Sequence, residues 1–178
     1  MRRSHVTREI IELVAIILVL FVVIRYVIHG YQMGANMEPT LTNNSSVMVN
    51  RLAYLFSQPH RGDAIVFHSP LHVSQDSIGR IIGLPGDHVR TDSTHVWVNG
   101  VLLNESYVRT PFNPEGREWV VATHMYFVMN DNRQIGDDSR NWGLLSQDNI
   151  IGKAVLVYWP IADWQLISSY SDVFNPVK

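Results

Sequence analysis

Cysteine is absent from the 178-residue chain. This absence excludes a disulfide framework, a cysteine nucleophile and thiolate metal sites. Lysine is almost as scarce, because only Lys153 and Lys178 are present. A chain of this length supports a single domain with a core large enough to fold without disulfides.

A basic excess is also missing. The chain carries 14 Lys and Arg against 16 Asp and Glu, for a formal net charge of −2. Nucleic-acid-binding proteins show a clustered basic surplus, so nucleic acid is not an expected partner. The sequence also contains no internal repeat and no low-complexity stretch.

A long apolar run over residues 10–28 is the strongest hydropathy signal in the chain. As a helix this run is roughly 28 Å long, which is enough for the core of one bilayer. It exceeds the apolar core of about 7–15 residues found in a cleaved secretory signal. Arg2, Arg3 and Arg8 precede the run, so its N-terminal side is expected in the cytoplasm. We therefore expect a single-pass cell-membrane protein with three parts: a cytoplasmic segment 1–9, an anchor 10–28 and an extracellular domain 29–178.

The chain after the anchor has the pattern of short strands separated by turns. β-branched and apolar residues are concentrated in six runs, at 46–52, 63–69, 79–84, 95–103, 125–130 and 152–160. Asn99-Gly100 divides the fourth run and is a strong hairpin signal, since both turn residues must take positive φ. Two prolines and a glycine indicate a loop over residues 109–119. No sustained helical periodicity follows the anchor, so we expect an all-β domain.

Four motifs follow the anchor in order. They are GANMEPTL (34–41), RGDAIVFHSP (61–70), GRIIGLPGDHV (79–89) and NDNRQIGDDSRNWG (130–143). Together they resemble the conserved boxes of the type I signal peptidase family, membrane-anchored serine proteases that remove signal peptides at the outer membrane face. The resemblance covers nearly the whole chain. It implies a signal-peptidase-type antiparallel β-sheet domain behind a single transmembrane helix.

The residues that carry the family's chemistry are missing from these motifs. The family uses a Ser–Lys dyad, in which a buried neutral lysine takes the proton of the attacking hydroxyl. Here the nucleophile position is Asn36, whose amide nitrogen is not nucleophilic, and the base position is Gly79. Gly136 occupies the position of the serine that orients the lysine. The resemblance therefore implies no catalytic residue, no metal and no cofactor.

The remaining motif residues are expected to form the groove and its framework. Arg80 cannot replace the lysine, because a guanidinium stays protonated and neighbouring strand residues point to opposite faces. Asp138 and Arg140 are expected to form a structural ion pair. Asn130 stands at a glycine position, where asparagine tolerates a left-handed backbone. The resemblance assigns groove or structural roles to Gly34, Met37, Pro39, Thr40, Arg80, Asp131, Asn132, Arg133, Asp138, Ser139 and Arg140.

Two smaller features have competing interpretations. His68 and His72 are four residues apart, but Pro70 breaks any helix that would align them, so a metal site is not favoured. Residues 54–56 (Tyr-Leu-Phe) form an apolar cluster that is either a membrane-resting patch or part of the core.

The sequence favours one function and leaves two alternatives open. We expect a signal-peptidase-like accessory or chaperone-like membrane protein that binds exported or surface-assembled clients, for example pilus proteins, by strand addition. An active signal peptidase or a sortase is a possible further partner. The alternatives are an active signal peptidase with a non-standard nucleophile and a regulator of an active paralogue.

The topology can be checked on intact protoplasts. Added protease should digest the 29–178 domain, because the arginines at the N-terminus place that domain outside. The chain should otherwise remain in the membrane at full length. Protection of the domain, or release of a shortened soluble form, would contradict the topology.

Overall fold

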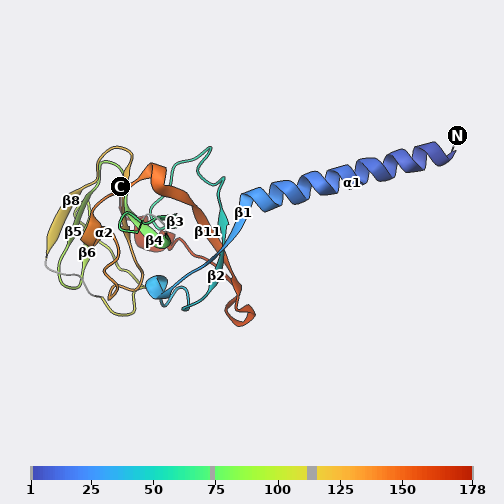
Figure 1. Cartoon of the computed structure of the whole chain (residues 1–178). Helices are drawn as coiled ribbons and strands as arrows, with labels where there is room; N and C mark the ends of the chain where they lie inside the picture. The colour runs from blue at the N-terminus through green and yellow to red at the C-terminus, as the bar shows by residue number, and fades with distance from the viewer. Residues whose placement is uncertain (1, 73–74, 112–115, 178) are drawn as a thin grey trace.

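The computed structural model describes residues 2–72, 75–111 and 116–177. A long helix, α1 (Arg2–Val27), projects from a β domain (Figure 1). Its side chains from Arg8 to Phe21 are exposed. No helix within these ranges combines the length and the apolar character that a membrane crossing requires. The anchor over residues 10–28 therefore stays a prediction.

The larger sheet has eight strands and every pairing in it is antiparallel. β12 (Gln165–Leu166) pairs with β11, outside the main strand order. Because chain neighbours are not always sheet neighbours, segments far apart in the sequence meet in this sheet. The main order is β1 (Ile28–Gln32), β2 (Ser46–Asn50), β11 (Ile150–Trp159), β3 (Ala64–His68), β4 (Asp76–Gly83), β9 (Met125–Met129) and β10 (Leu145–Ser146).

A four-stranded sheet lies at the end of the domain away from α1 (Figure 1). The predicted hairpin is confirmed, since Asn99 and Gly100 have φ values of 51° and 79°. The predicted loop 109–119 is wrong at its end, because Trp119 pairs with Val89 and its ring lies 4.7 Å from that of Phe127. The strand order is β7 (Val101–Leu102), β6 (Val96–Val98), β5 (His88–Thr91) and β8 (Arg117–Val120).

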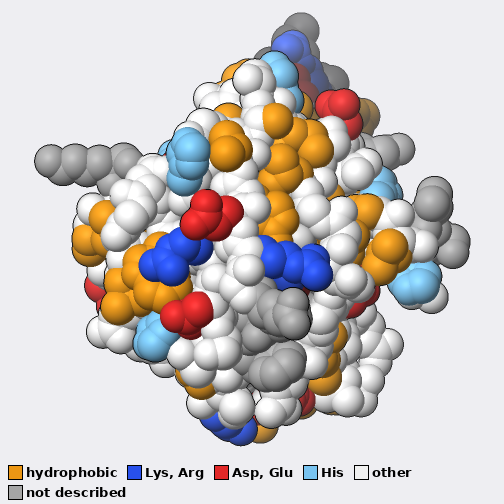
Figure 2. Space-filling view, turned by 90° about the vertical axis from the view of Figure 1, so that its left-hand side faces the viewer, with side chains coloured by type: hydrophobic (Ala, Val, Ile, Leu, Met, Phe, Trp, Pro, Cys, Tyr) orange, Lys and Arg blue, Asp and Glu red, His pale blue; other side chains and the backbone are white. Residues whose placement is uncertain are grey.

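The outer face of this end of the molecule mixes apolar, acidic, basic and histidine side chains (Figure 2). A basic and an apolar side chain meet between β5 and β6. The Arg90 guanidinium carbon lies 3.7 Å from the centroid of the Trp97 ring. Charges of both signs thus lie close to apolar groups on this face.

Short helices lie between the strands or after the last strand, and they were not predicted. They are η1 (Ala35–Met37), α2 (Ser139–Trp142), η2 (Gln147–Asn149), η3 (Ile161–Asp163) and α3 (Ser171–Phe174). Each contains only three or four residues, too few for a helical period to appear in the sequence.

The core contains three apolar clusters. One joins η1 to the large sheet and includes Met37, Val49 and Ile78. A second includes Phe67, Val128 and Leu145. The third contains Ile82 and Phe127 together with the C-terminal residues Phe174 and Val177. The alternating burial of β2 explains how one face of that strand enters the first cluster. The predicted all-β antiparallel fold is confirmed for the domain.

The apolar cluster at residues 54–56 was expected to be either a membrane-resting patch or part of the core, and its residues differ in burial. Tyr54 is half-buried, and its hydroxyl donates a hydrogen bond of 3.0 Å to Asp63. Burial, together with the nearby Asp63 charge, raises the pKa of Tyr54 well above its usual range. Leu55 and Phe56 are instead 63% and 97% exposed. Only Tyr54 therefore belongs to the interior.

Candidate functional site

Asn36 lies in η1, a single 3-10 turn that packs against β4. Met37, the next residue, is fully buried in the same cluster as Ile78 of β4, and this contact fixes the turn on the sheet. Asn36 is half-buried. Its Oδ1 lies 3.9 Å from the point that a Cβ at Gly34 would occupy. The side chain of Asn36 therefore stays close to its own turn.

Asn132 joins this turn to the loop after β9. Its backbone N–H donates to Asn36 O at 3.0 Å, and its Nδ2 donates to Ala35 O at 3.1 Å. These two bonds bring the first and the last sequence motif together, although nearly 100 residues separate them. The meeting point of the motifs is the candidate site.

Gly79 lies in β4 at the point where the strand gains its second neighbour. Residues 76–80 pair with β3. The ladder with β9 begins only at Arg80, opposite Met129. Among the described strands, none pairs with residues 76–79 on the β9 side. That stretch of β4 is a free edge beside η1.

The space that a base would need at residue 79 is filled. A Cβ there would lie 2.6 Å from Cγ1 of Val128 and 3.4 Å from Cε1 of Phe67. Valine is stiff about χ1, so its methyl group cannot easily turn away. At Gly136, by contrast, a Cβ would meet no atom within 4 Å. The space beside Gly79 is therefore closed by apolar packing, whereas the space at Gly136 is open.

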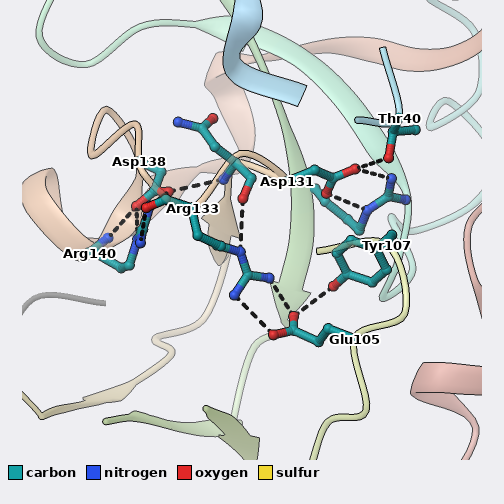
Figure 3. A network of polar contacts seen from close by, with 9 residues as sticks. Thr40, Glu105, Tyr107, Asp131, Arg133, Asp138 and Arg140 are labelled. Atoms are coloured by element: carbon teal, nitrogen blue, oxygen red, sulfur yellow. Dashed lines mark hydrogen bonds and ion pairs between the residues drawn. The ribbon is translucent and has the colours of Figure 1, made fainter. Parts of the chain in front are cut away.

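Arg80 forms a buried ion pair with Asp131, which is labelled in Figure 3. Both side chains are fully buried, and Nε and Nη2 of Arg80 donate to the two carboxylate oxygens at 2.9 and 2.6 Å. Thr40 Oγ1 donates to Asp131 Oδ2 at 2.6 Å. Burial alone lowers the pKa of Arg80, but the charge and hydrogen bonds of Asp131 raise it, and the net direction is upward.

Four further groups enclose the Arg80 guanidinium. Its Nη1 donates to the carbonyls of Gly62 at 2.6 Å and Ser168 at 2.8 Å. The rings of Tyr107 and Tyr170 each lie with their centroid 4.7 Å from its Cζ. Arg80 is thus directed into the interior and cannot reach a bound peptide as a base.

Two more arginines, both in the last motif, are ion-paired with carboxylates. Arg133 pairs with Glu105, which also accepts the hydroxyl of Tyr107 at 2.7 Å (Figure 3). The ion pair expected between Asp138 and Arg140 is present at 2.6 Å, with both side chains almost fully buried. Burial, assisted by the charge of Glu105, raises the pKa of Tyr107 well above its usual range.

Backbone groups complete this network. Asp138 also accepts the N–H of Asn130 at 3.0 Å, and Arg140 donates to Arg133 O at 2.8 Å. Ser139 Oγ accepts the N–H of Val128 at 2.9 Å. The residues of the last motif therefore fix the end of β9 and the loop that follows it.

The tolerance of asparagine for a left-handed backbone is not used at Asn130, because the described non-glycine residues with positive φ do not include it. Its side chain explains its presence instead. Nδ2 of Asn130 donates to the carbonyls of Ile135 and Asp137, both at 3.2 Å. Asn130 thus closes the loop from inside.

A cavity of about 170 Å³ lies beside the site, and its lining includes Glu38, Pro39, Arg109, Asn132 and Gln134. No cluster of three or more potential metal ligands is found in the part of the chain that the structure describes. His68, which the sequence analysis considered as a metal ligand, has its Nδ1 hydrogen-bonded to Asp76 Oδ1 at 2.7 Å.

Sequence reasoning missed three residues that shape the site: Glu105, Tyr107 and Val128. Glu105 and Tyr107 lie outside the motifs, and Val128 lies in an apolar strand where nothing distinguishes it from its neighbours. Only the packing of the strands and loops identifies them.

Residues 7–159 match the protein family described as "Signal peptidase, peptidase S26". Signal peptidase I of Leptolyngbya laminosa is 36% identical over 138 residues, which cover 74% of this chain and 68% of the relative. Signal peptidase IB of Staphylococcus aureus is 28% identical over an alignment of 193 residues, covering 98% and 97%. A crystal structure of signal peptidase I from Enterococcus faecalis has 32% identity and a TM-score of 0.48, covering 55% of this chain and 97% of that one.

The antiparallel β domain and its four motifs define a protein of the signal-peptidase type. The chain belongs to the signal peptidase family, peptidase S26. Its first and third motifs contain Asn36 and Gly79.

The closed space at Gly79 can be tested by unfolding. Gly79→Ala should lower the free energy of unfolding by about 1–3 kcal/mol, because the new methyl group overlaps Val128. Gly136→Ala is the matched control and should stay within about 0.5 kcal/mol of wild type. Combining Gly79→Ala with Val128→Ala should remove most of the penalty, measured against Val128→Ala alone. Equal stability of the two alanine variants in urea titrations would contradict the packing.

The buried Arg80–Asp131 ion pair predicts that two Arg→Met substitutions differ in their effect on the free energy of unfolding. Arg80→Met should cost about 3–5 kcal/mol of unfolding free energy, since it leaves the Asp131 carboxylate buried without its partner. Arg90→Met removes a cation–π contact at the surface and should cost about 0.5–1 kcal/mol. Similar losses in both variants would show that Arg80 does not hold the framework.

Proposed function

We propose that this chain is a membrane protein that binds an extended segment of an exported or surface-assembled client without cleaving it. It acts as an accessory or chaperone-like factor, for example beside a sortase or an active signal peptidase in pilus assembly. The single observation that carries the proposal is the closed space at Gly79, where Val128 fills the position from which a base would extend.

Two described groups that could supply the missing chemistry, Lys153 and Thr40, are held by other contacts. Lys153 is the one lysine among the described residues, and its ammonium is ion-paired with Asp63. The Thr40 hydroxyl donates to Asp131, whose charge is neutralised by Arg80. A hydroxyl held in this way has no base to take its proton. This arrangement argues against an active peptidase with Thr40 as nucleophile.

The free edge of β4 supports binding by strand addition. Over residues 76–79 the backbone faces the β9 side without a described strand partner, and η1 packs close to the same strand. An extended peptide can pair with such an edge through main-chain hydrogen bonds, which need no catalytic side chain. Binding can therefore persist where cleavage has been lost.

The membrane location is part of the proposal. It rests on the apolar run 10–28 and on the arginines that precede it. The described side chains of α1 within this run, Ile10 to Phe21, are exposed in the isolated chain. A bilayer would cover them. The β domain would then meet its client at the outer membrane face.

The proposal is tested by restoring the missing groups. Wild type should cleave a preprotein with a small-x-small site no faster than the uncatalysed background, since losing the nucleophile typically costs about a millionfold. The combination Asn36→Ser, Gly79→Lys and Val128→Ala should regain some cleavage. Val128→Ala is included to make room for the lysine. Gly136→Ser should raise the rate further, because the open space there accepts a hydroxyl.

The controls separate chemistry from binding. Two partial variants should show no cleavage above background, because dyad residues act as a unit. One carries only Asn36→Ser, and the other carries Gly79→Lys and Val128→Ala without Asn36→Ser. Recovery should be partial, as a misplacement of about 1 Å can cost a hundredfold. Cleavage by wild type that disappears in Thr40→Ala would overturn the proposal. A folded restored variant that neither cleaves nor traps the preprotein would show that the groove no longer accepts a peptide.

A further inference from the structure

The free edge of β4 ends where β9 joins the sheet. Arg80 is the first residue of β4 that pairs with β9, and its partner there is Met129. After Met129 the chain leaves the sheet as a loop. A segment paired with residues 76–79 cannot continue along β4, because β9 occupies the next position. Such a segment must leave the edge beside the loop that follows β9.

The cavity of about 170 Å³ lies at this exit. Asp131 is part of its lining, and the same carboxylate accepts hydrogen bonds from Arg80, the residue at which the free edge ends. Asn132 also lines the cavity and is bonded to Asn36 O and Ala35 O of η1. The cavity therefore borders both the turn that carries Asn36 and the end of the free edge.

The size of the cavity limits what it can hold. Pockets that enclose a whole small molecule measure roughly 300–1,000 Å³. At about 170 Å³ this cavity is smaller, so it suits one side chain of a longer ligand.

Two charges of opposite sign face the cavity without an ion-pair partner. Glu38 is half-buried and Arg109 is exposed, and both line the space. Within the described residues, no ion pair joins them to each other or to another group. The other charged residues of the lining, Asp131 and Arg133, are ion-paired. The cavity thus presents one negative and one positive group to a ligand.

This pair of charges disfavours a charged ligand of either sign. A lysine or arginine side chain would meet Arg109, and an acidic side chain would meet Glu38. An aliphatic side chain would displace water from these groups without replacing its hydrogen bonds. A carboxamide is neutral and carries two N–H donors and an oxygen acceptor, so it can satisfy both charges. The hydroxyl of Thr110 and the amide of Gln134, which also line the cavity, donate and accept in the same way.

We propose that this cavity binds the carboxamide side chain of an asparagine or glutamine in the client segment, at the residue that leaves the edge of β4. Glu38 accepts the N–H groups of the carboxamide, and Arg109 donates to its oxygen. This inference rests on the proposed client-binding function and specifies one residue of the client.

The first arm of the test scans a peptide probe against the full-length chain in detergent micelles. The probe is a fluorescent signal-peptide segment with a small-x-small site, carrying glutamine, glutamate, lysine or norleucine at successive positions. At one position the glutamine probe should bind about tenfold tighter than the other three, as expected for hydrogen bonds to charged groups. Equal affinity of the four probes at every position would contradict the carboxamide site.

Charge removal should change the preference at that position in a defined way. Glu38→Gln should tighten the glutamate probe about tenfold and leave the lysine probe weak, because the repelling carboxylate is gone and Arg109 remains. Arg109→Gln should do the reverse and tighten the lysine probe. Glu118→Gln and Arg90→Gln are the matched controls, since these residues line a different cavity on the four-stranded sheet. Neither control should alter the order of the probes.

The second arm uses N-acetylglutamine methylamide, which needs no strand edge. NMR of the full-length chain should show a saturable shift of the Gln134 side-chain amide. The shift should be absent with N-acetylnorleucine methylamide, and it should be lost in the double variant Glu38→Ala and Arg109→Ala.

The two arms separate the two proposals. Binding of the small amide without binding of any peptide probe would keep the carboxamide site and overturn the client-binding function. Probe binding with no glutamine preference, together with no shift from the small amide, would overturn the carboxamide site and keep the client-binding function. Failure of both arms would overturn both.

Discussion

The buried pair between Arg80 and Asp131 is the interaction on which the rest of the structure depends. A charge without a partner in this interior would cost several kcal/mol, so every segment that contacts the pair must converge on it. Those contacts come from distant parts of the chain: Thr40 after η1, the Gly62 carbonyl before β3 and the Ser168 carbonyl near the C-terminus. The pair therefore fixes the motifs relative to one another whether or not the domain performs chemistry.

This independence supports the proposal that the framework persists without a catalytic dyad. Gly79 and Arg80 are neighbours on β4, but successive strand residues point to opposite faces. Arg80 lies in the interior, whereas its neighbour Gly79 has no side chain and the space beside it is closed by Val128. Asn132 still holds η1 against the loop after β9 through two hydrogen bonds. What remains is a positioned turn beside a free strand edge, which suits the binding of an extended segment.

The features that could be predicted from the sequence are those that local residue patterns determine. The β-rich runs, the Asn99-Gly100 hairpin and the Asp138–Arg140 pair are present, because alternation, turn chemistry and short spacing determine them. Trp119 was assigned to a loop, since two prolines and a glycine precede it and its packing on Phe127 is long-range. Val128 could not be identified, because its role depends on how β9 packs beside β4. Asn130 was explained by backbone tolerance, whereas its side chain closes a loop whose shape no motif specifies.

Binding without cleavage is tested most directly by one titration on the full-length chain. A labelled signal-peptide probe with a small-x-small site is brought to equilibrium with the protein, and the mass of the same probe is then measured after prolonged incubation. Saturable binding with the probe intact is the predicted result, because in the proposed function an extended segment pairs with the free edge of β4, and Asn36 and Gly79 offer no nucleophile and no base. Enzyme-dependent fragments, or the absence of saturable binding, would contradict it.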